Sequence, residues 1–170
     1  GSWYEGIEWL NQVLRTAVES EDFELATCSE LIDKQYSLQR IAPFAGANVG
    51  KGYGECLLDN NNSWMIRYVR KACERMIDLA VRFSDDTGLK ARSLNLASKE
   101  LLLAMAGDWP MMLHDGEMPE YAEERFKESV SAFSTVYDSL GSNSISTEWL
   151  TKMEKKHPLF SDMNYHVFSR

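Results

Sequence analysis

The sequence predicts an all-α protein, a helical bundle of three long and several short helices with one long glycine-rich loop. Apolar residues recur with helical spacing in most of the chain, whereas no segment shows the alternation typical of a β-strand. The stretch 91–113 begins as a helix and becomes apolar on nearly every side at residues 101–106. Such a helix is normally surrounded by other helices, so we expect it to lie at the centre of the bundle.

The N-terminal part of the chain predicts two helices. Apolar residues recur with helical spacing over 7–17, and the polar segment 20–22 ends this first helix. A second, short helix is expected over 30–36, with either Thr27 or Ser29 as its cap.

The segment 39–63 has no periodic pattern. One proline and four glycines punctuate it, and an Asp-Asn-Asn-Asn run closes it. A loop of this length in a compact domain is usually either functional or disordered. No strand precedes its glycines and no Lys-Ser/Thr pair follows them, so we do not expect a phosphate-binding loop.

Longer helices follow this loop. Ser63 can cap a helix over 64–83, and Thr87 can cap the central one. The central helix is expected to stop at Gly107-Asp108-Trp109-Pro110, and a turn follows at 114–116. Pro119 suits the first turn of a helix that extends to about Leu140. A last helix, capped by Ser146 or Thr147, is expected to end at Lys156.

Charge and composition exclude several classes of function. The formal net charge of −8 argues against nucleic acid as a partner. No apolar run approaches the roughly 20 residues of a membrane span, and no secretory signal is recognisable. Three cysteines without metal-type spacing favour a reducing, cytoplasmic compartment, and three histidines with no i, i+4 pair argue against zinc. We expect no metal and no cofactor.

No complete set of catalytic residues is recognisable. A sugar-processing enzyme needs two carboxylates, but the acidic pairs of this chain are better interpreted as solvated surface. No serine lies in a nucleophile-elbow pattern. We therefore expect no catalytic residue in this chain.

Binding is easier to support than catalysis. Several aromatic residues lie at expected junctions between loops and helices: Trp3, Tyr4, Trp9, Tyr53, Trp64 and Trp109. Aromatic faces can stack on sugar rings, and carboxylates beside them can bind the hydroxyl groups of the sugar. Alternatively, each tryptophan is a core residue that packs at the end of a helix. For Asp108 and Trp109, beside a proline, both interpretations remain open.

The order of short motifs resembles glycoside hydrolase family 57. The motif WYEG at 3–6, followed by IEWL, resembles the stretch after the catalytic acid in that family. The densest match is LNLASKELLL at 94–103, followed by DWP at 108–110. Further matches are CSE at 28–30, GYGE at 52–55, LD at 58–59, NSW at 62–64, 67–76, YAEERF at 121–126, TEWL at 147–150 and 160–170. The resemblance covers essentially the whole chain and is strongest to the α-amylase and 1,4-α-glucan branching enzyme branch.

This resemblance implies a role without catalysis. In the family, a (β/α) barrel carries a Glu nucleophile and an Asp acid/base, and a helical domain packs over the cleft. The resemblance therefore implies that 1–170 is a single C-terminal helical domain of a longer enzyme. Because the chain starts with Gly1-Ser2 and not with Met, we expect these two residues to be a remnant of tag cleavage. The missing barrel would be its partner. The residue matching Asp108 binds glucan, and we expect Asp108, Trp109, Trp3 and Tyr53 to be substrate-binding.

The sequence departs from the family at two tryptophans of the glycine-rich loop. Asn48-Val49-Gly50 replaces a Ser-Ser-Trp-Gly loop, and Cys56-Leu57-Leu58 replaces a Val-Trp-Leu segment. Each lost aromatic face removes about 1–2 kcal/mol of contact, so α-glucan binding by the isolated chain is expected to be weak or lost. The alternative is a non-enzymatic helical module for protein interaction, or an engineered standalone domain.

Overall fold

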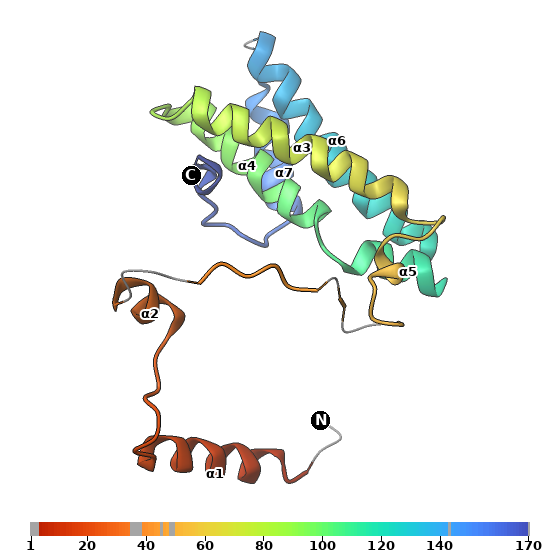
Figure 1. Ribbon diagram of the computed structural model, residues 1–170. Helices are drawn as coiled ribbons and strands as arrows, with labels where there is room; N and C mark the ends of the chain where they lie inside the picture. Colours follow the sequence, from red (N-terminus) through yellow and green to blue (C-terminus); the bar gives the residue numbers. More distant parts are fainter. Residues whose placement is uncertain (1–3, 35–38, 45, 48–49, 143, 170) are drawn as a thin grey trace. The chain divides into compact units, whose positions relative to one another are not determined.

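The computed structural model describes residues 4–34, 39–44, 46–47, 50–142 and 144–169 (Figure 1). Within these residues the regular structure is entirely helical, which confirms the all-α prediction. The chain divides into two compact units, residues 1–44 and 45–170, which are described separately. The expectation that 1–170 is one domain stays a prediction.

The first unit contains α1 (Gly6–Glu19) and α2 (Cys28–Lys34), close to the two helices expected there. Thr27 caps α2 in a reciprocal arrangement. The backbone N–H of Thr27 donates to Glu30 Oε2 at 2.7 Å, and the N–H of Glu30 donates to Thr27 Oγ1 at 3.3 Å. This capping box explains why α2 begins two residues earlier than the apolar pattern predicts. Neither helix contains a buried residue.

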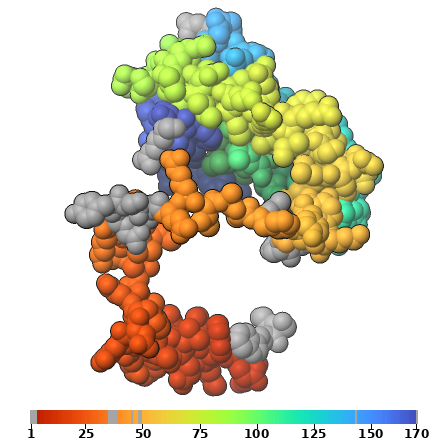
Figure 2. Space-filling view, in the orientation of Figure 1, coloured from red at the N-terminus to blue at the C-terminus, as the bar shows by residue number. Residues whose placement is uncertain are grey.

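The second unit contains the helical bundle, drawn as a ribbon in Figure 1 and with all its atoms in Figure 2. Its three long helices are α3 (Ser63–Arg82), α4 (Gly88–Ala104) and α6 (Pro119–Ser142). Shorter elements complete it: α5 (Asp108–Asp115), α7 (Thr147–Lys156) and the 3₁₀ helices η1 (Glu55–Leu57) and η2 (Tyr165–Phe168). Helix α4 contacts α3, α6, α7 and η2, so the expected central helix is confirmed.

The core of the bundle surrounds α4. Leu94, Ala97 and Leu101 of this helix are almost fully buried in a cluster with apolar residues of α3, α6, α7 and η2. The C-terminal segment closes the cluster through Tyr165, whose hydroxyl donates to the carbonyl oxygen of Phe83 at 2.5 Å. Burial of this apolar surface is the dominant stabilising contribution to the unit.

Two details of the central region differ from the prediction. The longest buried run of α4 lies at 96–101 and includes Lys99 and Glu100, whereas Met105 at the helix end is exposed. Asp108, Trp109 and Pro110 do not end a helix but begin α5. Pro110 is tolerated there because the N–H groups of a first helical turn have no partner within the helix.

Candidate functional site

Asp108 is an exposed carboxylate at the start of α5. It is the first residue of that helix, so its negative charge lies beside the positive end of the helix dipole. The carboxylate is accessible to solvent at this position. It can accept hydrogen bonds from the hydroxyl groups of a ligand.

Trp109, the next residue, is anchored in the protein. Its indole N–H donates to the carbonyl oxygen of Leu103, near the end of α4, at 2.7 Å. The half-buried ring packs against the small core cluster around Met65 and Phe126. It also meets the ring of Tyr121 edge to face, with 6.3 Å between centroids. Trp109 therefore fixes α5 to the bundle and so positions Asp108.

A cavity of about 240 Å³ lies beside Trp109. It is lined by residues of α4, α5 and α6 and by the segment after α7: Leu103, Trp109, Tyr121, Arg125, Ser129, His157, Pro158 and Leu159. The indole is thus a core residue that also lines a cavity with aromatic and polar walls, and its contact with sugar stays a prediction. Such walls are typical of small-molecule sites.

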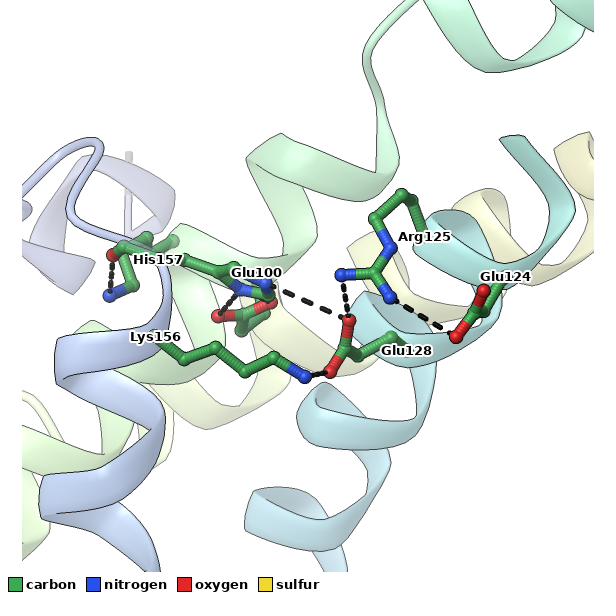
Figure 3. A network of polar contacts seen from close by, with 7 residues as sticks. Glu100, Glu124, Arg125, Glu128, Lys156 and His157 are labelled. Atoms are coloured by element: carbon green, nitrogen blue, oxygen red, sulfur yellow. Dashed lines mark hydrogen bonds and ion pairs between the residues drawn. The ribbon is translucent and has the colours of Figure 1, made fainter. Parts of the chain in front are cut away.

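A network of charged residues lies next to this cavity (Figure 3). Glu100 of α4 has no exposed surface, and its Oε1 lies 2.9 Å from Nδ1 of His157. The other ring nitrogen of His157 lies 3.8 Å from Oε2 of Glu128 on α6. His157 therefore connects a fully buried carboxylate to a second one on the neighbouring helix.

Cations from two elements complete the network around Glu128. Arg125 Nη1 lies 2.8 Å from Glu128 Oε2, and Lys156 at the end of α7 forms an ion pair with Glu128 Oε1. Figure 3 shows that these side chains converge on Glu128. Lys99, next to Glu100, donates to the backbone oxygen of His157 at 2.7 Å. Buried charges need such partners, and here they join α4, α6 and α7.

This network does not form a glycosidase pair. Glu100 is enclosed completely, so a substrate cannot approach its carboxylate. The sequence reasoning did not identify Glu100, Glu128 or His157. The signal that could have found them is the charged pair Lys99-Glu100 inside an otherwise apolar helix face, because buried charges require partners.

Tyr53 lies in the glycine-rich loop, and its side chain is 70% exposed. The loop turns around the carboxylate of Glu55, which accepts hydrogen bonds from the N–H groups of Lys51 and Tyr53. The first of these lowers the pKa of Glu55. Gly50 has φ of +62°, a backbone conformation that favours glycine, and a Cβ there would meet the carboxylate of Glu55. This turn therefore needs glycine and uses its amides internally.

The loop is attached to α5 by two side chains. Asn62 is buried and donates to the carbonyl oxygens of Cys56 and Pro110, at 2.8 and 3.0 Å. Asp59 Oδ2 lies 2.6 Å from Nδ1 of His114. This hydrogen bond raises the pKa of His114 above its usual 6.5 and lowers the pKa of Asp59 below its usual 3.8.

Three predicted site residues therefore lie on α5 or on the loop that leads into η1, and these elements contact each other. Asp108 and Trp109 are on α5, and the loop of Tyr53 continues into η1, which contacts α5. Trp3 and Val49 lie outside the described residues. Leu57, at the second position where the family has tryptophan, is partly exposed beside α5.

Within the part of the chain that the structure describes, no group of three His, Cys, Asp or Glu side chains is placed to hold a metal ion. None of the described helices has the length and apolarity that a membrane crossing needs. Cys28, Cys56 and Cys73 are free thiols.

Comparison with known proteins supplies the family. A family model described as "1,4-alpha-glucan branching enzyme, C-terminal" matches residues 68–168. A 1,4-alpha-glucan branching enzyme of Thermococcus kodakarensis is 25% identical over 124 residues, which are 72% of this chain and 18% of that protein.

Two solved structures are also similar to this chain. The α-amylase AmyC of Thermotoga maritima matches with 30% identity and a TM-score of 0.60, over 99% of this chain and 31% of that one. A GH57-type branching enzyme of Pyrococcus horikoshii shares the fold, with 22% identity and a TM-score of 0.69, over 99% of this chain and 32% of that one. The chain thus spans about a third of these structures or less.

Proposed function

The chain belongs to the family of 1,4-alpha-glucan branching enzyme C-terminal domains, and from this premise we propose that it contributes substrate contacts to the cleft of a glucan-processing enzyme. The catalytic Glu and Asp of that enzyme lie outside this chain. The ligand is an α-1,4-glucan, and the domain acts on it by binding alone.

Asp108 is the residue that carries this proposal. It is exposed at the start of α5, within the region that matches the family. The rigid attachment of α5 supports a binding role, because Trp109 and Asn62 hold both sides of its first turn. A carboxylate that is held in place loses little conformational freedom when it binds a hydroxyl group. Trp109 and Tyr53 supply aromatic surface near α5, and Trp3 is proposed as a further contact.

The partner of the domain is proposed to be the catalytic barrel of the longer enzyme. Helix α1 supports this, because its apolar side chains are exposed, with Ile7 84% exposed and Leu10, Leu14 and Val18 at least half exposed. The two units are proposed to act as a single domain of 1–170 in that enzyme. Free thiols fit a reducing compartment such as the cytoplasm.

Chemical-shift mapping with maltooligosaccharides tests the proposal. We expect saturable shifts at Asp108, Trp109 and residues 50–58, and their loss in Asp108→Asn. Asp115→Asn is the matched control, because Asp115 is an exposed aspartate at the other end of the same helix. The absence of chemical-shift changes throughout α5 and residues 50–58 at millimolar sugar would contradict the proposal.

The second candidate is a non-enzymatic module that binds another protein, either natural or as an engineered standalone domain. The exposed apolar face of α1 is the observation that favours it. It predicts no sugar-dependent shifts in α5. The titration therefore separates the two functions.

A further inference from the structure

A groove between α3 and α6 has no role in the function proposed above. Its volume is about 370 Å³, and it is lined by Trp64, Arg67, Tyr68, Lys71, Ala72 and Arg75 of α3 and by Val130, Phe133 and Ser134 of α6. This volume lies in the range of about 300–1,000 Å³ that is typical of small-molecule sites. None of its lining residues lines the cavity beside Trp109.

The groove is positively charged in a protein whose net charge is −8. Arg67, Lys71 and Arg75 recur at intervals of four residues, so they lie along one face of α3. Their carboxylate partners are few. Lys71 lies 3.4 Å from Glu74, and that carboxylate also pairs with Arg70 at 3.4 Å.

The two arginines that line the groove have no acidic partner among the described residues. The guanidinium of Arg75 lies over the ring of Tyr137, 4.6 Å from its centroid, and forms no ion pair in the described part of the chain. Arg67 is exposed, and its side chain makes neither a hydrogen bond nor an ion pair with any described residue. A guanidinium without a carboxylate is suited to bidentate binding of phosphate.

Aromatic rings form one end of the same groove. The rings of Trp64 and Tyr68 are nearly perpendicular, with 6.0 Å between centroids and an interplanar angle of 83°. The indole N–H of Trp64 already donates to the backbone oxygen of Asn61 at 2.9 Å. Tyr68 is 54% exposed. Flat, partly exposed rings beside cations can stack on the ring of a ligand.

We propose that this groove binds a small organic anion that joins a phosphate to a flat ring, the chemistry of a nucleoside monophosphate. The arginines contact the phosphate, Tyr68 stacks on the face of the ring, and Trp64, perpendicular to Tyr68, meets its edge. A neutral glucan carries no negative charge to balance two guanidinium groups that lack a carboxylate partner among the described residues, whereas a phosphate does. The net negative charge of the whole chain opposes a long polyanion, so a single small anion fits best.

Binding of adenosine monophosphate to the full chain tests this proposal, with calorimetry for affinity and tryptophan fluorescence for the ring contact. We expect saturable binding and quenching. Adenosine alone and inorganic phosphate alone should each bind at least about ten-fold more weakly, because each makes only half of the contacts. Absence of saturable binding would overturn the proposal, as would phosphate binding as tightly as the nucleotide.

Variants locate the site. Arg67→Gln should weaken binding by roughly ten-fold or more, since it removes charge-assisted hydrogen bonds. Arg70→Gln is the matched control, because Arg70 is on the same helix, 82% exposed, and does not line the groove. Its affinity should stay within about two-fold of the unmodified chain. Equal losses in the two variants, with helix content unchanged in both, would show a diffuse charge effect and contradict the assignment.

Discussion

Glu100 is the single residue with the most unusual environment, because its carboxylate is fully buried on the central helix. Its partner, His157, lies just beyond the end of α7. Removal of one member of a buried pair leaves the other member without its hydrogen-bond partner. Glu100→Ala should therefore lower the free energy of unfolding by about 3–5 kcal/mol.

Urea denaturation measures this change, and Glu124→Ala is its control. Glu124 also pairs with a network residue, Arg125, but its side chain is 71% exposed. An exposed pair contributes about 0–1 kcal/mol. Equal destabilisation by the two substitutions would contradict the view that burial makes Glu100 critical.

The Asp59–His114 pair gives a prediction for pH. The pKa of His114 is raised, so its contribution to stability is complete below pH 6.5 and is lost as the pH rises through the folded-state pKa. The pKa of Asp59 is lowered, so its contribution is complete above pH 3.8 and is lost as the pH falls through the folded-state pKa.

The stability difference between the chain and His114→Asn should therefore be largest between pH 3.8 and 6.5 and should decrease on either side. Denaturation midpoints across this range measure it. A difference that does not vary with pH would show that the pair is not ionised in the folded protein.

Sequence reasoning at the scale of residues singled out Asp108 and Trp109, whose binding role stays a prediction, and missed the charged network. Asp108 and Trp109 could be found because they interrupt a long apolar stretch beside a proline. Glu100 and His157 are 57 residues apart, and only the packing of α4 against the end of α7 brings them together. No local pattern encodes such a pair.

Among the elements, α5 is the one on which the proposed site depends. Trp109 holds it to α4 through the 2.7 Å hydrogen bond to Leu103. Trp109→Phe keeps an aromatic ring but removes the pyrrole part of the indole and leaves that carbonyl without its partner; loss of the hydrogen bond alone should cost about 1–3 kcal/mol. Amide hydrogen exchange within α5 should become faster.

Tyr121→Phe is the control for this substitution. It removes a polar group from the same aromatic cluster but keeps the edge-to-face contact with Trp109. Exchange in α5 should change little. If both variants accelerate exchange equally, the indole hydrogen bond is not what attaches the helix.

The long helices followed from the sequence more reliably than α5 did. Helix α6 begins at Pro119 as predicted, because a proline suits a first turn and an apolar stripe follows it. Helix α5 has eight residues and contains Pro110, so its own pattern was too short to distinguish a helix from a turn. Contacts with η1 and α6 stabilise it.

At the scale of the whole molecule, family membership agrees with the resemblance that the order of short motifs indicated. The fold class could be predicted because nearly every segment of the chain has helical periodicity. The aromatic site could be predicted only in part. Trp3 lies outside the described residues, and the side chain of Tyr53 is positioned by a turn around Glu55 that only the three-dimensional structure reveals.

The isolated chain should neither hydrolyse nor branch amylose at an enzyme-like rate, because the two carboxylates of the retaining mechanism are not expected in it. Reducing-sugar and branch-point assays measure this. A complete family 57 enzyme under the same conditions is the positive control. If the isolated chain still turned over amylose after a second purification, this would contradict the proposal that the domain binds glucan without catalysing its reaction.

The affinity of the chain for a maltooligosaccharide, compared between Asp108→Asn and Asp115→Asn, tests the central proposal most directly. We predict weak but saturable binding that Asp108→Asn reduces by about ten-fold, as expected for loss of a hydrogen bond to a charged group. Asp115→Asn should leave the affinity unchanged. Equal affinities for the two variants, or no binding by the unmodified chain, would contradict a glucan-binding role for this domain.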